Sequence, residues 1–444
     1  MNIFLYEGAV ETHKLDATSS MILFKNYIHY SSKKQENNYH FYYPKDSKNQ
    51  HIVPFPELRK DNVYCYSHKM PGTWYRFHFD TNAMKEQIKM LDIDFDVIFT
   101  NDIETTTHLN ELFNNRWHFD IPIVAYWDWV ELPENGGNLN NFVMQCASVL
   151  TTARTGVNSQ WQKQIILNYA TDYFNKETLS LLDEKIQPLY IGIETDEINQ
   201  YLSKEKQDRD NFRILWNHRI APQTGFYKCI KQLDEIDKTY DITLVVTNPN
   251  SKPLPNRDYI EEHRNLDRKD YFRLIQSCNC GVGYFQKYSA WSMSITDMIA
   301  CNLPVLVPNK YCFKEMMGKD YPLLFNNDNE FFTKLSLLIE CKDKFNWNSN
   351  TIESIREKHD WNNRINDWID FIDKSLSMRT IETDKSYEIL DIIIKDYPIE
   401  KRDLFSKIGF GGMIKWTPYR NFLKQNGVKD EISRKTVYKI DEKV

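Results

Sequence analysis

Short apolar runs alternate with stretches of helical periodicity along the first half of the chain. The runs are rich in β-branched and aromatic residues, as buried strands are. Four of them are predicted strands: residues 2–6, 96–100, 121–126 and 148–152. Between them, residues 83–91 and 159–169 repeat apolar positions at helical spacing. Strands that alternate with helices predict a parallel sheet covered on both faces.

A second alternation of the same kind begins at Phe212. Its predicted strands are 213–216, 242–247, 280–284 and 304–307, and its predicted helices are 226–236, 267–277, 292–300, 331–339 and 362–375. Residues 187–196, punctuated by Pro188 and Gly192, separate the two alternations. We therefore predict an α/β protein with two Rossmann-like domains, 1–195 and 196–379, that face each other across a cleft.

Residues 380–444 form a third piece, in which shorter apolar clusters are separated by turn residues. Helices are predicted at 386–397, 400–408 and 418–426, with a short strand at 436–440. A core of this size is marginal on its own. We expect a small, mainly helical C-terminal extension that docks on the main body.

Composition adds limits to this picture. Of the 444 residues, 41% are hydrophobic, which is enough for sizeable cores. No run approaches the ~18 apolar residues of a membrane helix, and the first residues lack the features of a signal peptide, so we expect a cytoplasmic protein without a membrane partner. The eight cysteines form no C-x-x-C pair, which argues against zinc and redox motifs; Cys278 and Cys280 are interpreted as part of a buried strand.

The net charge of −6 is spread unevenly. Residues 401–444 hold eleven Lys or Arg against five Asp or Glu, a balance of +6, so the other 400 residues carry −12. Aromatic residues such as Trp416 and Tyr419 lie between the basic ones, and this interleaving suits phosphate contact with base stacking. A nucleic-acid partner is one interpretation. A solvated mixed-charge surface, or a docking or oligomerisation module, is the other.

Residues 288–307 have the most informative chemistry. They run from a loop of small residues into the predicted helix 292–300 and on to a Pro-led strand. Unpaired N–H groups at a helix start suit a diphosphate, and here they belong to Trp291, Ser292 and Met293. Asp297, further along the helix, can accept hydrogen bonds from ribose hydroxyls. The pattern predicts a nucleotide-sugar pocket; the alternative is a helix-surface carboxylate.

On these residues the chain resembles the GT-B glycosyltransferases, above all their large retaining family. Residues 297–305, D-M-I-A-C-N-L-P-V, are similar to the family's E-A-x-A-C-G-x-P-V. Residues 289–292, S-A-W-S, fall where the family has E-G-F-G, and residues 188–196 resemble its P-N-G-V-D-T linker. The resemblance covers residues 1–379 in element order. It implies a UDP-sugar donor, a retaining reaction, no permanently bound cofactor and no required metal.

Two departures accompany the resemblance. The family has two acidic residues eight positions apart; here the second is Asp297, and Ser289 replaces the first, which usually contacts the donor sugar. Arg219, at the end of I-L-W-N-H-R, matches an Arg that neutralises the donor diphosphate. Thr224 stands where the family has a Lys. A surface arginine at a strand end is the alternative for Arg219.

The loop after the first strand adds two candidates by resemblance. Gly8 would let the backbone approach the donor phosphates. His13, followed by Lys14, is similar to the S-H-K of the tRNA-queuosine mannosyltransferases, which also carry a W-x-H-R like residues 216–219. His13 is therefore a candidate catalytic residue.

Asp128, in A-Y-W-D-W directly after the predicted strand 121–126, is the other catalytic candidate. Ligands of open α/β sheets bind beyond the carboxyl ends of the strands, so Asp128 is placed to accept the proton of an acceptor hydroxyl. Trp127 and Trp129 are candidates for stacking on a sugar or base. Phage DNA glucosyltransferases have a similar strand followed by an aromatic residue or His and then Asp. A helix N-cap is the alternative for Asp128.

These features predict a glycosyltransferase that moves a sugar from a UDP-sugar to 5-hydroxymethylcytosine in double-stranded phage DNA, with the target base flipped outward. The likeness to phage DNA glycosyltransferases and the basic C-terminal residues favour this acceptor. One alternative is a transferase acting on a tRNA base or a cell-surface polysaccharide. Another is a non-catalytic nucleic-acid-binding protein on a GT-B scaffold, because Ser289 and Thr224 replace the family's Glu and Lys.

Overall fold

The computed structural model describes residues 1–7, 19–45, 62–69, 84–85, 88, 93–115, 121–132, 137–203, 211–247, 252–287, 291–341 and 349–376. The chain divides into two compact units. The first is Met1–Asn158, Lys163–Leu189 and Asn366–Val444, and the second is Ser159–Gln162 and Tyr190–Ile365. The domain limits predicted from the sequence remain predictions, and the elements predicted between residues 386 and 440 lie outside the described residues.

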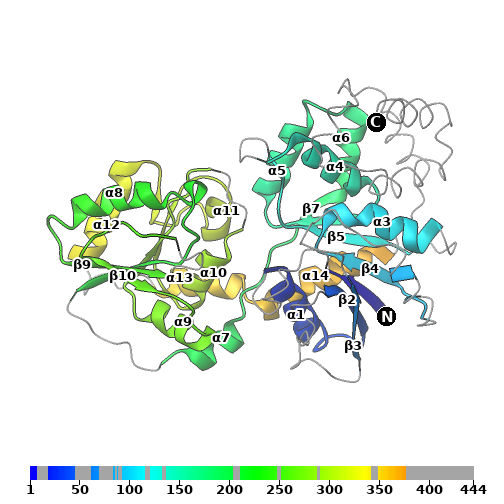
Figure 1. Cartoon of the computed structure of the whole chain (residues 1–444), viewed down its shortest axis with the longest axis horizontal. Coiled ribbons are helices and arrows are strands. Elements are labelled where there is room, and N and C mark those ends of the chain that lie inside the picture. Colours follow the sequence, from blue (N-terminus) through cyan, green and yellow to red (C-terminus); the bar gives the residue numbers. More distant parts are fainter. Residues whose placement is uncertain are drawn as a thin grey trace. The chain divides into compact units, whose positions relative to one another are not determined.

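The first unit contains a seven-stranded parallel sheet in the order β3-β2-β1-β4-β5-β6-β7 (Figure 1). Its strands are β1 Asn2–Tyr6, β2 Asn38–Lys45, β3 Val63–Lys69, β4 Val97–Thr100, β5 Ile123–Trp127, β6 Arg154–Val157 and β7 Ile186–Pro188. The predicted strands 2–6, 96–100 and 121–126 are confirmed as β1, β4 and β5. The strands β2 and β3 were not predicted.

The helical segments that belong wholly or largely to this unit are α1 Ser19–Ser31, η3 Ile103–Thr105, α3 Thr106–Asn110, η4 Glu111–Asn115, α4 Leu139–Leu150, α5 Gln160–Ala170, α6 Lys176–Lys185 and α14 Trp361–Leu376. The predicted helices 159–169 and 362–375 are confirmed as α5 and α14. Most of the predicted helix 83–91 lies outside the described residues.

The predicted strand at 148–152 is wrong. These residues form the end of α4 and the turn after it, and strand β6 begins only at Arg154. Phe142, Cys146 and Val149 recur at helical spacing, and all three are fully buried. The apolar run is therefore the last part of a buried helical stripe, in which the Phe142 ring contacts those of Tyr169 and Tyr173.

Helix α14 supplies part of the core of the first unit, although it lies far along the chain from the strands. The ring of Trp368 lies 5.1 Å from that of Tyr126, 6.0 Å from that of Phe99 and 6.4 Å from that of Tyr27. All four side chains are almost completely buried. A helix that would extend the second alternation along the sequence thus contributes its apolar face to the first unit.

The second unit contains a six-stranded parallel sheet in the order β10-β9-β8-β11-β12-β13 (Figure 1). Its strands are β8 Phe212–Trp216, β9 Ile242–Thr247, β10 Ile260–His263, β11 Cys280–Val282, β12 Val305–Pro308 and β13 Leu324–Phe325. Its other elements are α7 Thr195–Tyr201, η6 Pro222–Thr224, α8 Phe226–Ile236, α9 Arg268–Gln276, α10 Met293–Ala300, α11 Phe313–Met317, α12 Asp328–Glu340 and α13 Ser349–Lys358.

The predictions for this second sheet are confirmed, apart from small shifts at the ends of elements. The four predicted strands 213–216, 242–247, 280–284 and 304–307 correspond to β8, β9, β11 and β12, and helix α8 has the predicted bounds. Cys280 begins β11 and Cys278 is buried beside it, in agreement with the buried-strand interpretation. Only the short edge strands β10 and β13 were not predicted.

The strand order places a switch point between β8 and β11. From β8 the chain proceeds to β9 and β10 on one side, then crosses back to β11, β12 and β13 on the other. Ligands of such open sheets bind outside the carboxyl ends of the strands at this point. The segments that follow β8 and β11 are therefore the candidate positions for a ligand-binding site.

None of the helices within the described residues has the length and apolar character that a bilayer span requires.

Replacement of Trp368 by Ala tests the assignment of α14 to the first unit. Removing this buried indole should lower the stability of that unit by about 3–5 kcal/mol, which chemical denaturation followed by tryptophan fluorescence will measure. Lys374, on the same helix, is 60% exposed and pairs with Asp370, which is also 60% exposed, one turn away. Lys374→Ala should therefore cost less than about 1 kcal/mol. Equal losses for the two variants would contradict the packing.

Candidate functional site

The loop after β8 brings Arg219 to the carboxyl edge of the second sheet. Arg219 is exposed, and among the described residues no carboxylate lies within ion-pair distance of its guanidinium. Its neighbour His218 is buried, with Nε2 3.1 Å from the carbonyl oxygen of Val282. Burial lowers the pKa of His218 to about 4, so this ring is neutral at pH 7 and ties the loop to β11. Arg219 is thus presented to solvent from a fixed loop.

Thr224 holds the same loop in shape. Its hydroxyl donates to the carbonyl oxygen of Arg219 at 2.7 Å and accepts from the N–H of Ala221 at 3.3 Å. Gly225 then takes a left-handed conformation with φ 75°, which leads directly into α8. Thr224 brings no charge to the loop; it fixes the backbone from which Arg219 extends.

The start of α10 lies at the other side of the switch point. Ser292 caps the helix, with its Oγ accepting from the N–H of Ile295 at 3.4 Å, and Met293 is the first helical residue. Trp291 is 6% exposed, and its ring contacts that of His359 at 4.9 Å. This packing holds the helix start in place. Gly8, His13 and Ser289 lie outside the described residues.

Asp297 is held by a hydrogen-bonded chain that joins α10, α9 and the end of β8. The Tyr271 hydroxyl donates to Asp297 Oδ2 at 2.8 Å and accepts from Asn217 Nδ2 at 2.9 Å. Asn217 Nδ2 also lies 2.9 Å from the carbonyl oxygen of Ser294, whose hydroxyl donates back to the Asn217 carbonyl oxygen at 3.1 Å. The aspartate is therefore not a freely solvated surface carboxylate, and its position is determined by two other elements.

Opposing interactions act on the pKa of the Asp297 carboxyl. Burial raises the pKa of its carboxyl to about 6, whereas the Tyr271 hydrogen bond and the positive charge of Arg268 both act to lower it. Arg268 in turn pairs with Glu194, and with Glu197 at 2.8 Å. The carboxyl of Asp297 therefore loses its proton at a higher pH than an ordinary aspartate does, and shifts of this kind are frequent at functional sites.

The sequence did not identify three of the residues that hold Asp297. Asn217 lies inside the quoted W-N-H-R, yet only Arg219 was singled out there. Tyr271 and Arg268 lie in the predicted helix 267–277, where nothing in the apolar pattern marks them. The hydrogen bond between Tyr271 and Asp297 follows only from the way α9 and α10 lie in the folded unit.

Asp128 directly follows β5 in the first unit and is partly buried. Trp127 is fully buried and its indole N–H donates to the carbonyl oxygen of Trp129 at 2.9 Å, so the expectation that Trp127 stacks on a ligand is wrong. Trp129 is 40% exposed. Helix α4 is capped by Asn138, so Asp128 is not its N-cap.

Comparison with known proteins identifies the fold. No protein-family model matches the sequence, and no curated protein matches it. Among solved structures, Anabaena Alr3699/HepE in complex with UDP has a TM-score of 0.61 at 11% identity, over 84% of this chain and 100% of that one. Sucrose-phosphate synthase from Thermosynechococcus elongatus has a TM-score of 0.63 at 9% identity, over 85% of this chain and 99% of the other.

The lipopolysaccharide outer core galactosyltransferase WaaB is also similar, with a TM-score of 0.58 at 12% identity, over 84% of this chain and 99% of that one. At these identities the likeness establishes the fold. The two Rossmann-like units have the GT-B architecture, as the sequence predicted.

Replacement of Tyr271 by Phe tests the chain that holds Asp297. Loss of the hydroxyl removes a hydrogen bond to the ionised carboxylate, so the pKa of Asp297 should rise further above its value of about 6. Carboxyl-carbon NMR titration of Asp297 will measure the shift. Tyr227→Phe is the matched control, because Tyr227 is 54% exposed on α8. An unchanged Asp297 pKa in Tyr271→Phe would contradict the described hydrogen bond.

Proposed function

We propose that this protein is a glycosyltransferase that uses a nucleotide sugar, with a UDP-sugar as the donor. The observation that carries the proposal is the Asp297 carboxylate, oriented by Tyr271 on a helix whose start lies at the switch point of the second sheet. The same fold in HepE has been solved with UDP and with UDP-glucose, which supports a nucleotide-sugar donor for this chain.

The proposed donor contacts follow the charges of the bound nucleotide. The diphosphate is assigned to Arg219 and to the amides at the start of α10, because a guanidinium and a helix N-terminus both favour an anion. The ribose hydroxyls are assigned to Asp297, whose ionised carboxylate accepts hydrogen bonds. As the sugar leaves, negative charge grows on the diphosphate, and the same positive groups stabilise it. This scheme calls on no metal ion.

For the acceptor we propose 5-hydroxymethylcytosine in double-stranded DNA, with retention of configuration. Support comes from the basic residues in 401–444 and from the position of Asp128 after β5. In this scheme Asp128 accepts the proton of the hydroxymethyl group, and the exposed ring of Trp129 stacks on the flipped base. His13 is retained as a further candidate for the catalytic step.

The affinity for UDP-glucose should depend on pH through Asp297. The folded pKa of about 6 lies above the ordinary value of 3.8, so the carboxylate is ionised at pH 7 and largely protonated at pH 5. Since the ionised form is the one proposed to bind ribose, UDP-glucose should bind roughly tenfold more weakly at pH 5 than at pH 7. Calorimetric titration of the full chain will measure the change.

Asp297→Asn is the control for this measurement. It keeps the size of the side chain but cannot ionise, so its affinity for UDP-glucose should be low and nearly the same at both pH values. The nearby His218 does not contribute to the pH dependence, because its pKa of about 4 keeps the ring largely neutral between pH 5 and pH 7. A wild-type affinity that does not change between pH 5 and pH 7 would remove Asp297 from the donor site.

A screen of nucleotide sugars against hydroxymethylated DNA, read by mass spectrometry, tests the acceptor. We expect a sugar-sized mass increase on hydroxymethylcytosine DNA and none on unmodified DNA. Asp128→Asn should lower kcat by at least about a hundredfold if the carboxylate is the base, with the Kd for the donor little changed. Transfer to tRNA or to a glycan in place of DNA would overturn the acceptor, and full activity of Asp128→Asn would overturn its role.

A further inference from the structure

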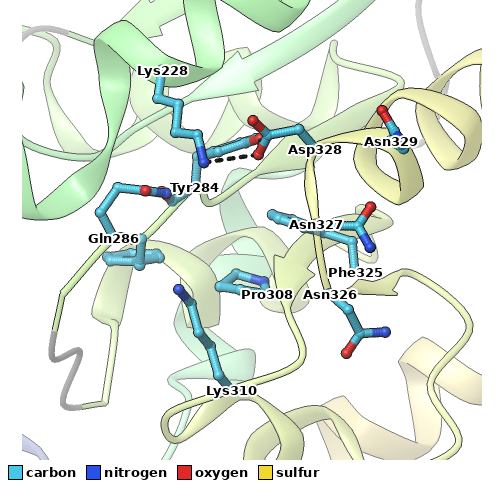
Figure 2. Close-up of a pocket in the computed structure, with 11 residues that line it drawn as sticks. Lys228, Tyr284, Gln286, Pro308, Lys310, Phe325, Asn326, Asn327, Asp328 and Asn329 are labelled. Atoms are coloured by element: carbon cyan, nitrogen blue, oxygen red, sulfur yellow. Dashed lines mark hydrogen bonds and ion pairs between the residues drawn. The ribbon is translucent and has the colours of Figure 1, made fainter.

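A pocket of about 430 Å³ lies in the second unit, at the carboxyl ends of β11, β12 and β13 (Figure 2). Its wall includes Tyr284 and Phe285 after β11, Pro308 at the end of β12 and Phe325 at the end of β13. None of the residues assigned to the donor is among those that line it. Its volume lies within the range of small-molecule sites.

Two lysines and one aspartate supply the charge of this pocket. Lys228 of α8 pairs with Asp328 at 2.8 Å, and the Tyr284 hydroxyl donates to the same carboxylate at 2.5 Å. Lys310, from the segment after β12, is exposed and its amine points toward the side of the pocket that carries Gln286 and Lys228 (Figure 2). Among the described residues, no carboxylate lies within ion-pair distance of Lys310. The described lining therefore has an excess of one positive charge.

The surroundings increase the preference for an anion. Desolvation of the Lys310 amine by neighbouring groups, together with the charge of Lys228, lowers the pKa of Lys310, so a negative group between the two lysines would relieve a repulsion. Asp328 is the first residue of α12, a helix of thirteen residues whose N-terminus lies in the pocket wall. Its partial positive charge acts in the same direction as the lysines.

The remaining polar groups of the pocket suit hydroxyls. Gln286, Asn326, Asn327 and Asn329 line it, and amide side chains both donate and accept hydrogen bonds. Three of them also make hydrogen bonds within the protein: Gln286 Nε2 donates to the Tyr284 carbonyl oxygen at 2.9 Å, Asn326 Nδ2 donates to Glu330 at 2.9 Å, and Asn327 Oδ1 accepts from the Glu330 N–H at 3.0 Å. Asn326 is oriented by Asn309, whose Nδ2 donates to its Oδ1 at 3.1 Å. Gln286 is fixed through its backbone, whose N–H donates to the Gln223 carbonyl oxygen at 2.9 Å. The aromatic residues Tyr284, Phe285 and Phe325 are almost completely buried and form the rigid back of the pocket.

We propose that this pocket binds a phosphorylated sugar, separately from the nucleotide-sugar donor. The phosphate would lie between Lys310 and Lys228, and the hydroxyls would meet the amides. The proposal does not depend on the function proposed for the Asp297 site. A sugar phosphate bound here would be an effector or second substrate of the second unit.

Calorimetric titration of the full chain with glucose 6-phosphate, glucose and inorganic phosphate tests this proposal. We expect glucose 6-phosphate to bind more tightly than either fragment, because only it engages both the lysines and the amides. Lys310→Gln should weaken its binding at least about tenfold, as expected for loss of a charged hydrogen bond to phosphate. Lys314→Gln, an exposed lysine on α11 outside the pocket, should bind as the wild type does.

Further variants separate this site from the donor site. Asp297→Ala should leave the affinity for glucose 6-phosphate unchanged, and saturating UDP-glucose should not displace the sugar phosphate. Asn326→Ala should weaken glucose 6-phosphate binding while leaving that of inorganic phosphate unaltered. Absence of binding at millimolar glucose 6-phosphate, equal affinity in Lys310→Gln, or displacement by UDP-glucose would each overturn the proposal. Failure of sugar transfer alone would bear only on the function proposed above.

Discussion

A carboxylate inside a packed layer of helices loses its hydration, and other groups must replace that water. Asp297 meets this requirement with the Tyr271 hydroxyl and the nearby charge of Arg268. Tyr271 in turn needs Asn217, and Asn217 binds the backbone of α10. Because each member satisfies the next, the end of β8, helix α9 and helix α10 cannot shift independently without leaving a buried polar group unpaired. The geometry of the candidate donor site depends on this chain of contacts.

The hydrogen bonds and charges around Asp297 compensate its burial only in part. Burial outweighs the stabilising contacts, so the pKa of the carboxyl stays above its ordinary value. In the proposed function, the ribose hydroxyls are the hydrogen-bond donors that complete this compensation. The Arg268 pairs with Glu194 and Glu197 keep the arginine close without making it a direct partner of Asp297.

Much of the fold could be predicted because the strands of parallel sheets give a recognisable sequence pattern. Strands buried on both faces appear as short continuous apolar runs, and β8, β9 and β12 were located in this way. The error at 148–152 shows the limit of that signal. A short apolar run looks the same at the end of a helix as in a strand, and only the packing of Phe142, Cys146 and Val149 decides between them. The tyrosine-rich strand β2 was missed because its sequence, N-Y-H-F-Y-Y-P-K, lacks β-branched residues and contains a proline.

Taken alone, the sequence determined the two alternations of strands and helices. It placed Arg219 and Asp128 after predicted strands and Asp297 within a predicted helix. These are local properties, since periodicity and punctuation depend on neighbouring residues. Tertiary structure alone decided that Trp127 is buried, that α14 packs in the first unit, and that Tyr271 and Asn217 hold Asp297. The physical reason is that these contacts join segments far apart along the chain. Their partners are selected by how the helices pack on the sheet, and no spacing in the sequence records that choice.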